Sequence, residues 1–264
     1  MTRTPGGRPP VVLITLGAVG LLFFTIPFIG LLGEVPWSDL PSLLGDDVVA
    51  DALRVSLIAS LGAAVIALIL GVPIAWLLAR VEFPGKSVVR GIVILPLVLP
   101  PVVSGAALLF ALGRRGFVGG PLDDAIGLVL PFSIWGVIAS ATFVAMPFLV
   151  ITVEGALRGM DRRREGAAAS LGARPWTVLR RITLPAIAPS LLAGLALTWA
   201  RAFGEFGATI TFAGNLQGRT QTLPLAVFVA LESNRGLAVA ISLVMVAVSA
   251  VVLIALRDRW WRAL

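Results

Sequence analysis

The chain of 264 residues contains no cysteine, no histidine and no tyrosine. Disulfide bonds, metal sites built on thiolate or imidazole, Ser-His-Asp triads and histidine proton switches are therefore excluded. Charged residues are scarce at 13%, whereas hydrophobic residues make up 58% and the mean hydropathy is +0.99. Soluble domains hold about 45–50% apolar residues. The composition predicts an integral membrane protein whose chemistry depends on carboxylates, arginines, hydroxyls or a partner.

Six apolar runs are each long enough to cross a bilayer as a helix, which needs about 20 residues. They cover residues 11–33, 52–79, 91–113, 131–153, 185–204 and 236–256. The first run is long for a signal-peptide core and lacks a small-residue cleavage pattern, so we expect a retained helix. The sequence predicts an all-α polytopic protein with one six-helix transmembrane domain over 11–257, between terminal segments 1–10 and 258–264.

Lysine and arginine gather on alternate sides of these runs. Fifteen of the 21 basic residues fall in the termini and around the segments after the second and fourth runs, five fall on the other side, and Arg201 lies within the fifth run. Because cytoplasmic loops are enriched in Lys and Arg, both termini are predicted to be cytoplasmic. The net charge of +7 is thereby explained by orientation, and no nucleic-acid partner is expected because the basic residues do not share one soluble face.

The tripeptide GKS, Gly85 to Ser87, ends like a phosphate-binding P-loop. That motif needs a glycine at position 80, which is Arg80, and a strand before and a helix after it in a soluble fold. The tripeptide lies instead in a short loop between two membrane runs. We therefore expect no cofactor on this chain, and any ATP must be bound by a partner.

The stretch REGAAASLGARPWTVLRRITLPA, Arg164 to Ala186, interrupts the apolar sequence. Residues 158–181 hold seven arginines against two acids, which is too polar for hydrocarbon, where each central charge costs about 2.5–3.5 kcal/mol. The segment is thus predicted to be a cytoplasmic loop over about 158–184. A solvated basic loop that only fixes topology explains the charge equally well.

Alanine-rich sequence within this loop favours a short helix over 165–171. Asp161 is placed to cap its start, and Gly172 and Pro175 end it. Small residues allow close backbone approach, which suits a helix docked into a groove on a partner.

Six residues of the loop stand at the spacing of a known signature. They are Ala167, Ala168, Gly172, Ile182, Leu184 and Pro185. They resemble the pattern E-A-A-x3-G-x9-I-x-L-P of permease subunits of bacterial ABC importers, in which the loop helix couples the permease to a separate ATPase. The signature glutamate falls on Gly166, whereas Glu165 is one residue early, about 100° around a helix. The resemblance implies the coupling residues Glu165, Gly166, Ala167, Ala168, Gly172 and Ala173.

Two further stretches carry a more specific resemblance. They are TWARAFGEFGATITFAGNLQGRTQTLPLAVFVALE, Thr198 to Glu232, and LPLVLPPVVSG, Leu95 to Gly105. Both resemble molybdate permeases, although the R-A-x-G-E-F-G core is shared with sulfate permeases. The implied pathway residues are Pro100, Pro101, Ser104, Arg201, Glu205 and Thr209, and the implied outer-loop residues are Asn215, Arg219 and Thr220.

The residues themselves support part of this interpretation. Arg201 and Glu205 stand at i and i+4 on one helix face, where they can pair with each other or face a water-filled path that attracts an oxyanion. Three prolines in LPLVLPP remove backbone donors and predict a helix bend. Arg219, Thr220 and Thr222 offer donors to an anion or a delivery protein, or cap a helix over LPLAVFVALE.

Together the resemblances imply the membrane subunit of an ATP-driven molybdate importer that works by alternating access. The implied partners are a second copy of the chain, two cytoplasmic ATP-binding subunits that hold ATP and magnesium, an extracytoplasmic molybdate-binding protein and the lipid of a bacterial or archaeal cytoplasmic (inner) membrane. A sulfate or tungstate permease is the alternative in the same class. A stand-alone secondary transporter needs midplane carboxylates, for which only Glu205 and Glu154 are available. An intramembrane enzyme has almost no supporting residues.

Overall fold

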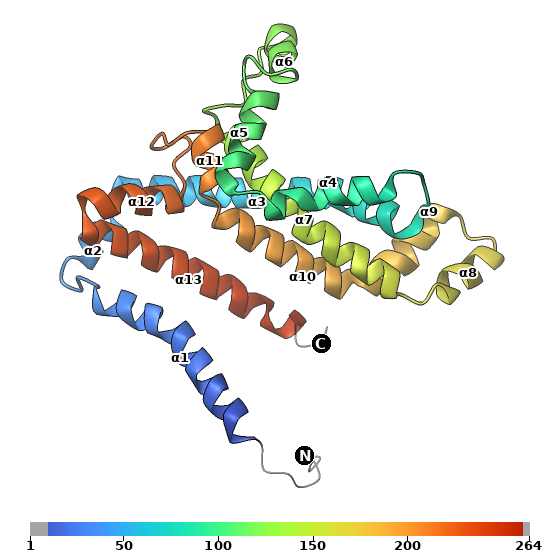
Figure 1. The fold of residues 1–264 in the computed structure, drawn as a ribbon, viewed down its shortest axis with the longest axis horizontal. Helices are drawn as coiled ribbons and strands as arrows, with labels where there is room; N and C mark the ends of the chain where they lie inside the picture. The colour runs from blue at the N-terminus through green and yellow to red at the C-terminus, as the bar shows by residue number, and fades with distance from the viewer. Residues whose placement is uncertain (1–9, 261–264) are drawn as a thin grey trace.

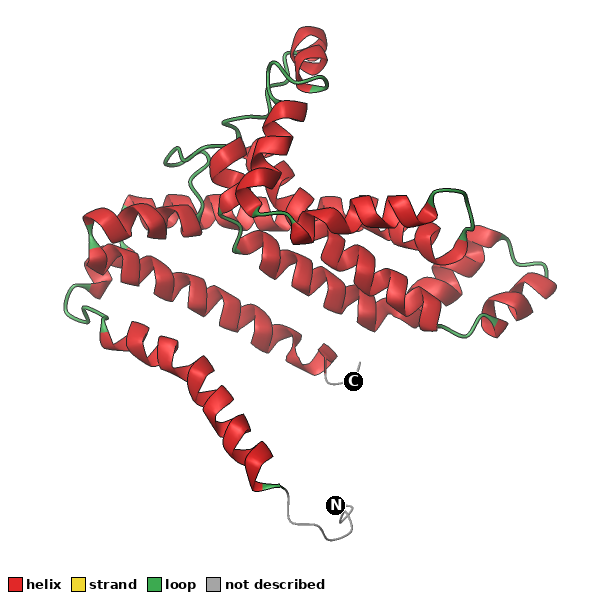
Figure 2. Cartoon of the chain, in the orientation of Figure 1, coloured by secondary structure: helices red, strands yellow, loops and turns green. Residues whose placement is uncertain are grey.

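The computed structural model describes residues 10–260, and for 256–260 the backbone alone. Within this part every regular element is a helix, as the all-α prediction requires (Figure 2). In chain order the helices are α1 (Val11–Gly33), α2 (Leu40–Leu44), α3 (Asp47–Arg80), α4 (Lys86–Val98), α5 (Pro101–Leu112), α6 (Gly119–Ile126), α7 (Ile134–Gly159), α8 (Arg163–Ser170), α9 (Pro175–Val178), the π-helix η1 (Leu179–Thr183), α10 (Leu184–Phe203), α11 (Gly207–Phe212), α12 (Leu223–Ser233) and α13 (Arg235–Trp260). The predicted terminal segments 1–10 and 258–264 lie almost wholly outside the described residues.

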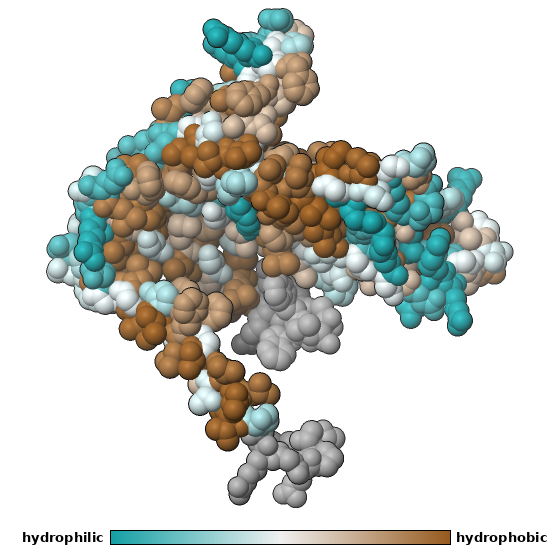
Figure 3. All heavy atoms as spheres, in the orientation of Figure 1, coloured by the Kyte–Doolittle hydropathy of each residue, from teal (hydrophilic) through white to brown (hydrophobic). Residues whose placement is uncertain are grey.

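Five helical stretches of the described chain are long and apolar enough to cross a membrane. They are Val11–Gly33, Asp47–Arg80, Ile134–Gly159, Pro175–Phe203 and Arg235–Ala255. Helices α3, α7, α10 and α13 run side by side, and α8 lies beyond one end of them while α2 and α12 lie toward the other (Figure 1). Hydrophilic residues gather at both ends of this bundle and leave an apolar surface between them (Figure 3). The arrangement matches the alternation of apolar runs and polar segments in the sequence.

The third predicted span, 91–113, is not one helix. Residues Leu99 and Pro100 are extended, with ψ of 138° and 135°, and they separate α4 from α5. A residue that precedes proline is driven out of the α conformation, and here two such steps follow each other because Pro100 is succeeded by Pro101. Pro101 then starts α5, a position where its missing N–H costs nothing. The prolines therefore cause a full break where the sequence predicted a bend.

The core of the bundle is the contact between α3 and α7, which is built on small residues. A stripe on α3 at four-residue spacing consists of Ala59, Ala63, Ala67, Gly71 and Ala75. Its alanines are at most 2% exposed. A β-carbon built on Gly71 would lie 3.3 Å from side-chain atoms of Met146 and Val150. Because lipid gives no hydrophobic drive between helices, such close packing is what holds membrane helices together.

Helix α10 continues this packing and leads to the end of the bundle where the candidate site lies. A β-carbon on Gly194 would lie 3.0 Å from the Cβ of Thr152 in α7. Trp199 and Phe203 stack with ring centroids 5.1 Å apart within a buried cluster shared by α3, α10, α12 and α13. The last turn of α10 is thereby held rigidly, and it carries Arg201.

Helix α1 matches its predicted bounds, but it buries none of its residues. It lies apart from the other long helices in Figure 1. Phe23, for example, is 73% exposed. A helix that is apolar all round needs lipid or another chain around it.

Candidate functional site

Arg201 and Glu205 form an ion pair where α10 ends. Arg201 Nη1 lies 2.6 Å from Glu205 Oε2, as the i, i+4 spacing predicts. Glu205 Oε1 accepts a hydrogen bond of 2.8 Å from the backbone N–H of Ala208, near the start of α11. The chain leaves its helix between Phe203 and Gly207, so the first amides of α11 have no intrahelical acceptor. One carboxylate, 2% exposed, thus balances a guanidinium and accepts from a free amide.

A cavity of about 310 Å³ opens beside this pair. Its lining residues are Pro101, Val102, Arg201, Gly204, Glu205, Phe206 and Gly207. The cavity therefore brings together three of the predicted pathway residues from α5, α10 and the segment before α11. The Arg201 side chain remains 30% exposed, so it can donate to an anion while its other face pairs with Glu205.

Two glycines allow α5 and α11 to meet with their backbones almost touching. A β-carbon on Gly105 would lie 2.7 Å from the carbonyl oxygen of Ala208 and from the Cβ of Thr211. A β-carbon on Gly207 would lie 2.7 Å from the Cβ of Pro101. The close contact of α5 with α11 thus fixes Pro101 and Gly207, two residues that line the cavity.

The other predicted pathway residues do not line this cavity. Thr209 is fully buried, and its Oγ1 lies 3.1 Å from Ser140 Oγ in α7. Ser104 is also fully buried in α5, and its hydroxyl has no hydrogen-bond partner among the described residues. Pro100 is exposed in the break between α4 and α5. A transport role for these three residues stays a prediction.

The three predicted outer-loop residues differ in their burial and in their contacts. Thr220 is fully buried, and its Oγ1 accepts from the backbone N–H of Leu216 at 2.9 Å, which closes the loop on itself. Arg219 is exposed and lines a cavity of about 400 Å³ together with Arg54 and Ser133. Asn215 is half-buried. Of the three, Arg219 has the donors best placed for a partner or an anion.

Of the two alternatives for Arg219, Thr220 and Thr222, a side-chain cap on α12 is not seen in the structure. Thr222 is the N-cap residue by position, but its side chain makes no capping hydrogen bond. The backbone N–H of Leu223 donates instead to Ser56 Oγ of α3, at 2.8 Å. A hydroxyl from a distant helix therefore takes the place of the local cap.

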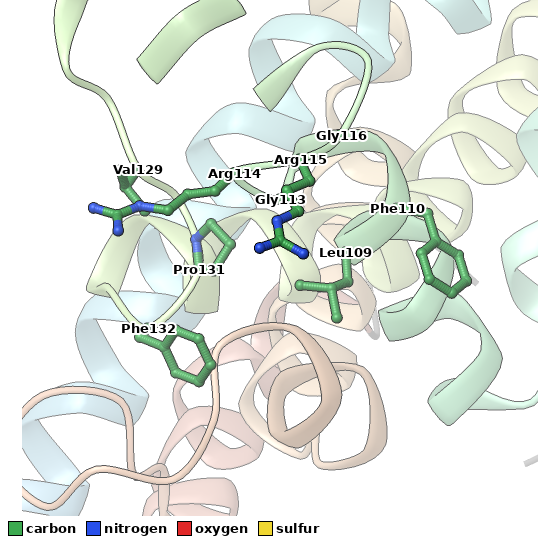
Figure 4. Close-up of a pocket in the computed structure, with 9 residues that line it drawn as sticks. All are labelled: Leu109, Phe110, Gly113, Arg114, Arg115, Gly116, Val129, Pro131 and Phe132. Atoms are coloured by element: carbon green, nitrogen blue, oxygen red, sulfur yellow. The ribbon is translucent and has the colours of Figure 1, made fainter. Parts of the chain in front are cut away.

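A third cavity, of about 590 Å³, lies where α5 ends and the α5–α6 hairpin begins. Figure 4 shows its residues, with the side chains of Arg114 and Arg115 diverging and Phe110 and Phe132 on opposite sides. Arg114 Nε lies 3.5 Å from Asp123 Oδ2. None of the pathway residues predicted from the sequence lines it.

The loop that the sequence predicts over about 158–184 contains a short helix, α8. Asp161 Oδ1 accepts from the N–H of Arg163 at 2.9 Å, as expected of a residue that caps the start. Gly172 has φ of 81°, the left-handed conformation that ends a helix without strain only in glycine, and Pro175 begins α9. Gly166, Ala167 and Gly172 are exposed, whereas Ala168 and Ala173 are half-buried.

Glu165 is turned toward its own chain. Its Oε1 lies 3.1 Å from Arg80 Nη2 at the end of α3 and accepts a hydrogen bond of 2.7 Å from Thr183 Oγ1 at the end of η1. Next to this contact is a cavity of about 710 Å³ between α8, α9, η1 and α3. The structure thus gives Glu165 two partners inside the chain.

A second ion cluster ties three helices at the same end of the bundle. Glu154 of α7 is 8% exposed, with Oε1 at 2.6 Å from Arg90 Nη2 of α4 and 2.9 Å from Arg158 Nη2. Arg158 Nη2 also donates to the carbonyl of Leu78 in α3 at 3.2 Å. Nearby, a hydrogen bond from Lys86 and its charge lower the pKa of Glu82 below the usual range. Glu154 is thus a paired structural carboxylate, not an open site for a coupling ion.

The fold and these sites define a helical membrane subunit of a transporter. The chain belongs to the family of binding-protein-dependent transport system inner membrane components, whose model matches residues 71–262. It is similar to the "Molybdenum transport system permease protein ModB" of Mycobacterium tuberculosis, with 42% identity over 91% of this chain and 90% of that protein. The Escherichia coli (strain K12) protein of the same name is 40% identical over 79% of this chain and 91% of its own length.

Solved structures agree on the fold. A bacterial ABC transporter involved in the import of the acidic polysaccharide alginate has a chain with a TM-score of 0.76 at 21% identity, covering 95% of both chains. An alginate ABC transporter in complex with a pentasaccharide-bound periplasmic protein gives 0.75 at 20% identity, over 92% of this chain and 90% of that chain. Both likenesses establish the helical arrangement of the chain.

Sequence reasoning found the local contacts and missed the distant ones. Arg80, Thr183, Arg90 and Ser140 were not singled out as members of a site. For Arg80 and Arg90 a signal exists, because each is a charge at the end of an apolar run and needs a partner or water. For Ser140 and Thr183 the sequence offers no signal.

Proposed function

We propose that this chain is the permease subunit of an ATP-driven importer that carries molybdate across the cytoplasmic membrane. The observation that carries this proposal is the 42% identity, over almost the whole of both chains, with a molybdenum permease. Relatives described as sulfate permeases are more distant, at 34% and 38% identity over 81% and 70% of this chain. Molybdate is therefore preferred over sulfate as the substrate.

We infer that ATP is hydrolysed by a separate pair of cytoplasmic subunits that receive α8. The support is that α8 stands beyond the end of the bundle, is rich in small exposed residues, and carries the signature spacing of coupling loops. Exposed Leu171 and Trp176, at 89% and 68%, give this end an apolar surface that water alone does not favour. Movement of α8 with the ATPase would switch the permease between inward-open and outward-open states.

A second copy of the chain completes the proposed permease. The support is α1, whose surface is exposed on every side, together with the cavity at Arg201, which is open on one side of the single chain. We infer that both termini lie in the cytoplasm, and the support is that the basic residues around 80–90 and 158–181 share one end of the bundle. A binding protein that delivers the anion would meet the opposite end, where Arg54 and Arg219 lie.

The test is reconstitution into vesicles with the ATPase and the cognate molybdate-binding protein. Radiolabelled molybdate is expected to accumulate only when ATP, the ATPase and the binding protein are all present. An ATPase variant that cannot hydrolyse ATP is the matched control. Uptake by permease-only vesicles, as a secondary transporter would give, or equal uptake of sulfate, would overturn the proposal. Competition with tungstate then measures how far the system separates two anions of similar size and charge.

A further inference from the structure

Helix α8 contributes no buried residue to the hydrophobic core. None of its residues is buried, and a cavity of about 710 Å³ separates much of it from α3. An eight-residue helix of this kind is marginal on its own in water. Its position relative to the membrane helices must therefore come from specific polar contacts.

One carboxylate supplies these contacts. Glu165 Oε1 is shared between Arg80 Nη2 at 3.1 Å and Thr183 Oγ1 at 2.7 Å, so a single atom joins α8 to the ends of α3 and η1. These are charge-assisted interactions, about twice as strong as neutral hydrogen bonds. In the sequence, Glu165 is 85 residues from Arg80 and 18 residues from Thr183.

Burial makes the link hard to exchange for water. The side chain of Arg80 is 8% exposed, that of Glu165 is 18% exposed, and Thr183 is 2% exposed. Among the described residues, Arg80 has one carboxylate within ion-pair distance, which is that of Glu165. Removal of either partner leaves a largely buried charge without compensation, which is far costlier than the loss of an exposed pair.

We propose that Arg80 and Thr183 are positioning residues for coupling, which hold Glu165 so that α8 moves as one body with the cytoplasmic ends of α3 and α10. Glu165 acts within the permease, and the surface of α8 left for a partner is formed by its exposed small residues. The π-helical turn of η1, which precedes α10 directly, places Thr183 at the junction through which such a movement enters the membrane. This inference rests on the proposed coupling of α8 to an ATPase.

The test compares uptake with ATP hydrolysis in the same vesicles, using the assembled transporter. Arg80→Met and Thr183→Val are expected to lower the molybdate transported per ATP by about fivefold or more, the low end of ordinary coupling free energies. Thr183→Ser keeps the hydroxyl and should restore the ratio. Lys86→Met is the matched control, because it breaks an i, i+4 pair with the exposed carboxylate of Glu82 at the same end of the bundle and should leave the ratio unchanged.

Exchanging the charges of Arg80 and Glu165 distinguishes a positioning role from a general effect on stability. The double variant Arg80→Glu with Glu165→Arg should recover much of the ratio lost in Arg80→Met, since the pair is rebuilt in reverse. A wild-type ratio in both Arg80→Met and Thr183→Val would overturn the inference. So would loss of ATPase binding in Glu165→Gln, because that result makes Glu165 an intermolecular contact. Failure of the proposed function looks different, because the wild-type vesicles themselves would then show no ATP-dependent uptake.

Discussion

The guanidinium of Arg201 is the counter-charge of Glu205, one helical turn away, and the two charged atoms are 2.6 Å apart. The pair is asymmetric, because the carboxylate is 2% exposed and the guanidinium side chain 30% exposed. The buried acid therefore fixes the geometry at the end of α10, while the arginine retains access to the neighbouring cavity. An anion that enters this cavity meets a cation already neutralised in part, so that binding is favourable without being tight.

Loss of the arginine should be costly. Arg201→Leu leaves the Glu205 carboxylate buried and unpaired, and we expect a destabilisation of about 3 kcal/mol together with loss of uptake. Thermal unfolding of the purified protein in detergent measures the first effect. Arg235→Leu is the control, because its pair with Glu34 is 74% and 54% exposed and should contribute below about 1 kcal/mol. Equal shifts in the two variants would show that the buried pair does not stabilise the fold.

The close glycine contact between α5 and α11 predicts that alanine is tolerated very differently at Gly105 and at Gly91. Gly105→Ala places a methyl group 2.7 Å from the Ala208 carbonyl oxygen and from Thr211 Cβ, and we expect it to cost about 1–3 kcal/mol by overpacking. Gly91→Ala, in α4, meets no atom within 4 Å and should leave stability unchanged or raise it by up to about 1 kcal/mol. Thermal unfolding of both variants measures the two stability changes. A neutral Gly105→Ala would mean that α11 moves away freely.

Bulk at Gly172 should affect transport more than folding. A β-carbon there meets no atom within 4 Å, so Gly172→Trp adds a large group on the exposed loop at the price of about 1–2 kcal/mol of backbone strain. We expect the complex to assemble and hydrolyse ATP but to lose uptake. Gly172→Ala carries the same strain without the bulk and is the control. Wild-type uptake in Gly172→Trp would place the docking surface elsewhere.

The Glu154 cluster predicts a local loosening of α4. Glu154→Gln leaves Arg90 and Arg158 without their shared carboxylate, and because both arginines reach water we expect a loss of about 1–2 kcal/mol and faster amide hydrogen exchange in α4. Glu82→Gln changes a carboxylate nearby that is 89% exposed, and it should leave the protection of α4 unchanged. Hydrogen exchange read out by mass spectrometry compares the two. Unchanged protection of α4 in Glu154→Gln would show that helix packing alone holds it.

The features that could be predicted from the sequence depend on neighbours along the chain. The run 11–33, the short helix ended by Gly172 and the Arg201–Glu205 pair follow from hydropathy, backbone preference and helical spacing. The break at Leu99 could not be distinguished from a bend by hydropathy, because the residues on both sides are equally apolar. Its cause lies in two adjacent X-Pro steps, which act on backbone angles.

The features that could not be predicted depend on residues far apart in sequence. Glu165 meets Arg80 across 85 residues, Thr209 meets Ser140 across 69, and the free amide of Leu223 finds Ser56 across 167. Each partner is chosen by the packing of long helices, which a single sequence does not specify. From the sequence alone, Glu165 is therefore only one of the implied coupling residues, and capping of α12 by Thr222 is one of two alternatives.

The break in the third apolar run separates two helices, α4 and α5, that are held by different contacts. The half predicted to be inner, α4, is tied to α7 through Arg90 and Glu154, whereas the half predicted to be outer, α5, is fastened to α11 through Gly105 and Gly207. Two extended residues connect the halves, so bending at Leu99 and Pro100 disturbs no helical hydrogen-bond ladder. Tilting of the inner half need not be transmitted to the outer half as it would be along a rigid rod. A movement of α4 can therefore occur without a matching movement of α5.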